Sequence, residues 1–130
     1  MMRINYIIII TIIFGDFLKY DYEVKSFNNK EEAENLLKNS RNRIDEINNE
    51  LFDLITQRTS LAKDIALAKD YLGMPVYDKK REDAVHKKIE RFAEENGLDI
   101  DIINQIVDML TILNKNEQKE ILRRNVDGQY

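Results

Sequence analysis

The sequence predicts an all-α fold: a three-helix subunit with one long N-terminal helix, assembled into an intertwined helical homodimer. The composition favours long helices, because the 130 residues are 43% hydrophobic and 34% charged, with one Pro and four Gly. An apolar seam with alternating spacings of three and four follows residues 44–72, as in helices that pair with one another. The length of that seam points to a second copy of the chain.

The first 28 residues are expected to form an extension outside the helical domain, which we place at residues 29–126. Their apolar run YIIIITIIFG, at residues 5–14, is shorter than the roughly 20 residues that a membrane-spanning helix needs. No A-x-A-like cleavage site follows it, so secretion would require residues 1–15 to act as an atypical signal. A β-like or disordered appendage is the favoured interpretation, and a start codon placed too far upstream is the alternative.

The first helix is predicted over residues 33–72. Acidic residues in NNKEEAEN suit a helix N-terminus, and Gly73 and Pro75 end the pattern. A helix of this length extends roughly 60 Å, whereas a compact domain of about 100 residues has a radius of gyration near 13 Å. Two shorter helices of the same chain cannot cover the seam, so we expect the long helices of two copies to pair. The seam residues are Ile44, Ile47, Leu51, Leu54, Leu61, Ile65, Ala68 and Leu72.

Two further helices are predicted, over residues 79–95 and 100–124. Asp78 can cap the first of them and Asp99 the second, and the Asn-Gly pair at 96–97 separates them. Residues 127–130 are expected to be a frayed tail. His86 is expected on the surface of its helix.

Several classes of function are disfavoured by composition. The formal net charge of -4 argues against nucleic acid as the main partner. With no Cys and a single His, a zinc site is not expected. No Gly-rich phosphate loop and no Ser/His/Asp arrangement is visible. We therefore expect no metal, no cofactor and no membrane partner.

One seam position holds Arg58 where the pattern calls for an apolar residue. It can form a buried pair with a carboxylate, or cover apolar surface with its stem while its charged end reaches water. Lys69 follows eleven residues later, which is three turns plus about 20°, and so lies on nearly the same face about 16 Å away. The two cations can converge on one small anion; alternatively, Lys69 is a solvated surface lysine.

Other polar residues lie where they can join such a site. Arg41 precedes Arg58 by seventeen residues, about 25 Å, so it can reach only a partner subunit's pocket or remain exposed. The apolar stripe of the third helix continues into Asn114 and Gln118, which either complete a pocket or mark a helix end passing into solvent. Cations with neutral donors suit a small dianion that carries hydroxyl or ether oxygens.

The start of the second helix, YDKKRED, offers a further charged group. Asp78, Arg81 and Glu82 are either part of the pocket or a capping residue with ordinary surface charges.

The ordered segments SRNRIDEINNELFDLITQRTSLAKDIALAK and PVYDKKRED resemble the all-α class of chorismate mutases, over about residues 36–122. The resemblance implies an entwined dimer of three-helix subunits with two equivalent sites. It implies conversion of chorismate to prephenate without a cofactor, in phenylalanine and tyrosine biosynthesis, and hence a cytoplasmic location. The chain is too short for a fused second enzyme, so it looks monofunctional.

The resemblance also assigns roles to the arginines. It implies that Arg58 binds a substrate carboxylate within its own subunit, while Arg41 completes the site of the other subunit. Arg81 looks like a supporting arginine of the same carboxylate network.

For the remaining polar positions the resemblance implies contacts with the substrate's oxygens. Lys69 looks like the donor to the ether oxygen, with Gln118 as its partner there. Glu82 looks like the residue that holds the ring hydroxyl, near the backbone of Asp78. Asn114 stands where the bacterial pattern often has Ser, so its role is less defined.

Two alternatives stay open at this point. An isochorismate-pyruvate lyase can use the same fold, although the intact D-x-x-R-E stretch at residues 78–82 favours the mutase. A catalytically silent helical dimer acting as an interaction module is the other.

Overall fold

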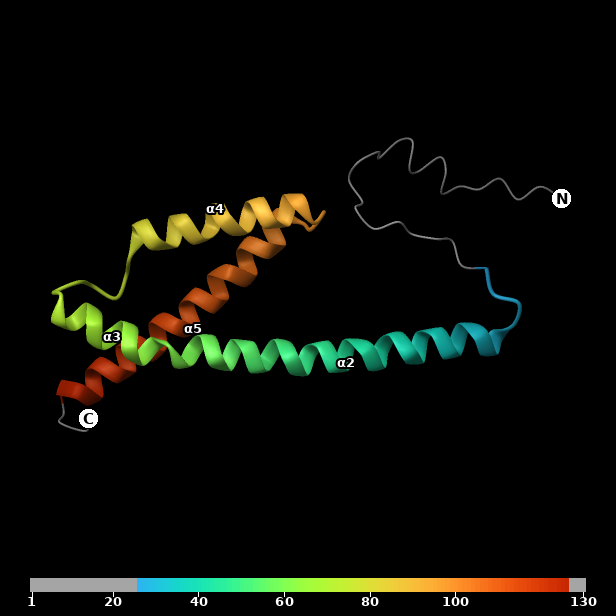
Figure 1. Cartoon of the computed structure of the whole chain (residues 1–130), viewed down its shortest axis with the longest axis horizontal. Helices are drawn as coiled ribbons and strands as arrows, with labels where there is room; N and C mark the ends of the chain where they lie inside the picture. The colour runs from blue at the N-terminus through green and yellow to red at the C-terminus, as the bar shows by residue number, and fades with distance from the viewer. Residues whose placement is uncertain (1–25, 127–130) are drawn as a thin grey trace.

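The computed structural model describes residues 26–126, which form four helical segments and no strand. Helix α2 forms a long arm, and α3, α4 and α5 gather at its C-terminal end, where α5 crosses back from the end of α4 to α3 (Figure 1). The predicted all-α fold with one long N-terminal helix is confirmed. The expectations for residues 1–25 and 127–130 lie outside the described residues. The helices are α2 (Lys30–Ser60), α3 (Ala62–Tyr71), α4 (Lys79–Glu95) and α5 (Ile100–Val126).

A reciprocal cap fixes the start of α2 within NNKEEAEN, the segment that the sequence indicates as the helix N-terminus. The side chain of Asn29 accepts a hydrogen bond from the backbone N–H of Glu32, at 2.9 Å. In return, the carboxylate of Glu32 accepts from the backbone N–H of Asn28, also at 2.9 Å. These bonds satisfy donors that a helix start otherwise leaves unpaired, and the bond from Asn28 lowers the pKa of Glu32.

The predicted helix over residues 33–72 is interrupted at Leu61, which is a correction. Just before the break, the hydroxyls of Thr56, Thr59 and Ser60 donate to backbone carbonyls of the preceding turn, at 2.6–2.9 Å. Such bonds compete with the helix's own pattern and often bend it. The apolar periodicity continues across the break, which explains why it predicted a single helix.

The remaining helix ends follow the expected local chemistry. Asp78 accepts from the backbone N–H of Arg81, and Asp99 from that of Ile102, each at 3.0 Å. Gly73 has a φ of 66°, the left-handed conformation that favours glycine after a helix. Helix α5 ends at Val126, two residues beyond the predicted end.

The packed interior lies where α3 meets α5. Ala62 and Ala66 are fully buried against Ile121, and Leu67 and Leu122 pack beside them. Alanines at this contact let the two helix backbones approach closely. The cluster therefore fixes α3 on α5 and supports the site above it.

Helix α2, in contrast, has no buried residue within the single chain. The exposed fractions of Ile44, Ile47, Leu51 and Leu54 are 55%, 45%, 48% and 59%. The seam that the sequence predicts is thus uncovered in one subunit. Within residues 26–126, none of the helices is long and apolar enough to cross a membrane.

His86, which was expected on the surface of its helix, is partly buried. Its side chain is only 28% exposed, between α4 and α5. One ring nitrogen lies 2.8 Å from the amide oxygen of Asn104, and the other lies 2.8 Å from the carboxylate of Asp108. The helical pattern placed His86 on α4, but which residues of α5 its side chain contacts depends on how α4 is rotated about its own axis.

Candidate functional site

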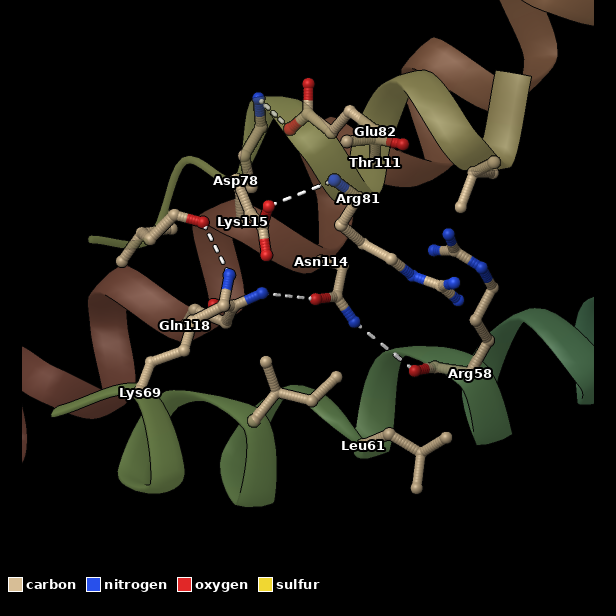
Figure 2. Close-up of a pocket in the computed structure, with 13 residues that line it drawn as sticks. Arg58, Leu61, Lys69, Asp78, Arg81, Glu82, Thr111, Asn114, Lys115 and Gln118 are labelled. Carbon is tan, nitrogen blue, oxygen red and sulfur yellow. Dashed lines mark hydrogen bonds and ion pairs between the residues drawn. The ribbon is translucent and has the colours of Figure 1, made fainter. Parts of the chain in front are cut away.

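A cavity of about 400 Å³ lies between the end of α2, α3, the start of α4 and α5 (Figure 2). Its volume falls within the range of small-molecule sites, roughly 300–1,000 Å³. Seven of the eight residues proposed from the sequence line it, and Arg41 does not. The lining residues are Arg58, Leu61, Ile65, Lys69, Val76, Asp78, Arg81, Glu82, Val85, Thr111, Asn114, Lys115 and Gln118.

Two guanidinium groups face each other in this cavity. Arg58, from the last turn of α2, donates to the backbone carbonyl of Leu110 on α5 at 3.0 Å. Arg81, from the first turn of α4, points its guanidinium toward that of Arg58 (Figure 2). Within residues 26–126, neither forms an ion pair with a carboxylate, so Arg58 is not half of a buried pair. Two facing guanidiniums without counter-charge favour an anion between them.

Lys69 is anchored, and is not the solvated lysine that was one alternative. Its ammonium donates to the backbone carbonyl of Val76 at 2.7 Å, so α3 holds the loop that leads into α4. An ammonium has three N–H donors, and this bond uses one of them. The others remain for a ligand in the cavity.

The acidic residues at the start of α4 differ in what they bind. Asp78 caps the helix through the backbone N–H of Arg81. Glu82 forms an ion pair with Lys115 of α5 at 2.9 Å, and both side chains are 24% exposed. Of these two carboxylates, only that of Glu82 therefore pairs with a charged side chain of the cavity.

Two amides on α5 form a hydrogen-bonded pair at the floor of the cavity. Gln118 is 3% exposed, and its Nε2 donates to Oδ1 of Asn114 at 2.6 Å. The Nδ2 of Asn114 donates to the backbone carbonyl of Arg58 at 3.4 Å. The Oε1 of Gln118 is buried without a partner. Of the two alternatives left open by the sequence, the helix end passing into solvent is therefore wrong.

Arg41 lies exposed on α2, outside the cavity of its own subunit. Sequence reasoning also missed two polar lining residues, Thr111 and Lys115. Both share a helical face with Asn114 and Gln118, because Thr111 lies three residues before Asn114 and Lys115 three before Gln118. Both residues could have been found by including the positions next to Asn114 and Gln118 on the same face of the helix.

A second groove lies between α2, α3 and α5. Its lining contains one lysine and one glutamate, so it lacks the surplus of cations that the first cavity has. The lining residues are Ile55, Thr56, Thr59, Ser60, Lys63, Leu113, Glu117 and Ile121. Among residues 26–126, no cluster of three or more His, Cys, Asp or Glu side chains is arranged to hold a metal ion.

Comparison with known proteins gives the cavity a chemical context. Residues 40–125 match the sequence profile of a family described as chorismate mutase type II. A protein of Methanocaldococcus jannaschii named chorismate mutase is 40% identical over 82 residues, which cover 63% of this chain and 83% of that relative. The matched region includes all four described helices except the first turns of α2 and the last residue of α5.

Proposed function

The chain belongs to the chorismate mutase type II family, and from this premise we propose that its cavity is where chorismate rearranges to prephenate. The observation that carries the proposal is the pairing of Arg58 with Arg81, two guanidiniums that face each other without a counter-charge. Chorismate is a small dicarboxylate, and a planar guanidinium binds a carboxylate through two parallel hydrogen bonds.

The charge of the lining supports the same assignment. Four of its residues are cationic, namely Arg58, Lys69, Arg81 and Lys115, and two are acidic. Taken together, the ionised side chains carry two positive charges in excess, which matches the two negative charges of the substrate. The apolar residues Leu61, Ile65, Val76 and Val85 complete the wall.

The rearrangement is pericyclic: one C–O bond breaks while one C–C bond forms within the same molecule. It needs no nucleophile and no proton transfer, so the protein contributes position and electrostatics. The arginines fix the two carboxylates and thereby hold the enolpyruvyl side chain over the ring. Because the bound substrate is already in this near-attack conformation, it loses less conformational entropy on its way to the transition state than the free substrate does.

The ether oxygen gains negative charge as its bond to the ring breaks. Lys69 supplies a donor for it, from an ammonium that its bond to Val76 already holds in place. Gln118 is the second donor. One of the two N–H groups of its Nε2 donates to Oδ1 of Asn114, which leaves the other for the ether oxygen.

We propose further that two subunits pair along α2 and that Arg41 completes the partner's cavity. The seam of α2 is uncovered, and two lining residues of the cavity, Leu61 and Ile65, are 56% and 38% exposed. In an antiparallel pair centred on Leu51, Arg41 of the partner subunit lies opposite Leu61, since each is ten residues from the centre. The pairing therefore covers the seam and closes this wall with a cation.

The function is tested by incubating the purified full chain with chorismate and identifying the product. Prephenate is the expected product. Arg58→Ala should reduce kcat/KM by at least about 100-fold, because a hydrogen bond to a charged group contributes about 1.5–3 kcal/mol and two are lost. Arg91→Ala, which removes an exposed arginine from α4, serves as the matched control.

Other products would overturn the assignment. Salicylate with pyruvate would identify the lyase, and unchanged chorismate would leave a helical dimer without this activity. We also propose a cytoplasmic location, because prephenate is consumed there in phenylalanine and tyrosine synthesis. Detection of the protein outside the cell would contradict it.

A further inference from the structure

Lys115 lies inside the cavity although the sequence motif gave it no part. Its ammonium is 2.9 Å from Oε1 of Glu82 and 5.2 Å from the centre of the Tyr77 ring. The two partners come from α4 and from the loop before it, whereas Lys115 comes from α5. The ammonium is thus held from two directions, and its position relative to α4 is defined.

The pair with Lys115 changes what Glu82 presents to a ligand. Among the described residues, Lys115 is the one charged group that contacts the carboxylate of Glu82, and Oε2 of that carboxylate is left without a partner. A carboxylate with no such neighbour would repel a dianionic substrate. It would also be free to turn toward Arg81 on its own helix and occupy a guanidinium that the substrate needs.

We propose that Lys115 is a positioning residue for substrate binding, which holds Glu82 at the edge of the cavity so that the free Oε2 accepts from the substrate's ring hydroxyl. The pair also offsets the charge of Glu82 against the substrate's carboxylates. This inference rests on the proposed function and assigns it one further residue. Because Lys115 acts through Glu82, its effect belongs to binding: KM should change and kcat should not.

The test is a double-mutant cycle on the full chain, with KM and kcat for chorismate as readouts. Lys115→Met keeps the length of the side chain and removes its charge. We expect it to raise KM about tenfold, as loss of a charge-assisted contact does, with kcat within about twofold of the parent. In a Glu82→Gln background the same substitution should change KM less than about twofold, because the charge that Lys115 offsets is gone.

Two further variants separate this role from simpler explanations. Lys115→Arg should restore KM to within about threefold of the parent, since a guanidinium can also pair with a carboxylate. Lys119→Met removes an exposed lysine one turn further along α5 and should leave both constants unchanged. The melting temperature of each variant shows whether the fold is intact.

Three outcomes would overturn the proposal. If KM is unchanged in Lys115→Met, the residue has no part in binding. If KM rises equally in both backgrounds, Lys115 acts on the substrate directly and not through Glu82. If kcat falls with KM unchanged, its role lies in the chemical step. Activity of the parent chain on chorismate is measured first, so failure of the proposed function is recognised separately.

Discussion

At the scale of single residues, Lys69 has two tasks that a substitution can separate. Its bond to the carbonyl of Val76 fixes the loop before α4. Its remaining N–H donors are proposed to stabilise the negative charge on the ether oxygen in the transition state. We expect Lys69→Ala to lower kcat about 100- to 1,000-fold, the usual effect of removing one donor aimed at developing charge. Steady-state kinetics measures this, with Lys80→Ala, an exposed lysine, as the control. A kcat near the parental value would remove Lys69 from the chemistry.

The amide pair on α5 is a second residue-scale feature with a measurable consequence. Gln118 is buried, and Asn114 is the only partner that the described residues give it. Asn114→Ala leaves both ends of the Gln118 amide unpaired, which should lower the free energy of unfolding by about 1–3 kcal/mol. Urea denaturation measures this change. Asn116→Ala, on the exposed side of the same helix, should be close to neutral. Equal effects of the two substitutions would contradict this account of the pair.

At the scale of elements, His86 couples α4 to α5. Both ring nitrogens face oxygen acceptors, because Nδ2 of Asn104 donates to Glu90 and so turns the amide oxygen of Asn104 toward the ring. The bond to Asn104, and then the charge of Asp108, raise the pKa of His86 above its ordinary value of 6.5. The doubly protonated ring satisfies both acceptors at once, so it is the form that joins the two helices.

This coupling predicts how stability depends on pH. Because the pKa of His86 is higher in the folded chain, its contribution is complete below pH 6.5 and is lost as the pH rises through the folded value. Unfolding followed in urea should therefore show less stability above that range, and His86→Gln should flatten this part of the profile. The chain has one histidine, so NMR titration reads its pKa directly. A measured pKa at or below 6.5 would contradict the prediction.

Helix boundaries could be predicted from the sequence where they depend only on neighbouring residues. Asp78 and Asp99 predict two helix starts, because a cap involves only the next few residues. The break at Leu61 was missed, since the apolar period continues through it and the three hydroxyl bonds just before it are not visible in that period. The contacts of His86 were missed for a related reason, because its partners depend on how α4 is rotated against α5.

At the scale of the whole molecule, the same distinction applies to the cavity. Helical spacing placed Arg58 and Lys69 on one face, and the family resemblance assigned roles to the candidate groups that the sequence offered on α4 and α5. Neither indicated that Lys115 would pair with Glu82, because that contact joins residues 33 positions apart on helices whose packing the sequence does not specify. The seam of α2 is the opposite case. It was predicted from periodicity, and its exposure in a single subunit supports the proposed pairing with a second copy.

The last prediction tests the assembled molecule by mixing two inactive variants. In the proposed homodimer of either variant, Arg41→Ala or Arg58→Ala, both sites lack one arginine. A dimer formed from one subunit of each variant has one site without either arginine and one site that is intact. If the two are unfolded together and refolded at equal concentration, half of the dimers are mixed, and activity should return to about a quarter of the parental value.

The control is each variant refolded alone, which should stay inactive. Different affinity tags on the two variants confirm that mixed dimers have formed. Mixed dimers without recovered activity would show that Arg41 does not serve the partner's site, whereas the cavity formed by α2–α5 of one chain would keep its assignment. A chain that remains monomeric at every concentration would contradict the pairing of α2 itself, since the seam around Leu51 would then stay exposed to water.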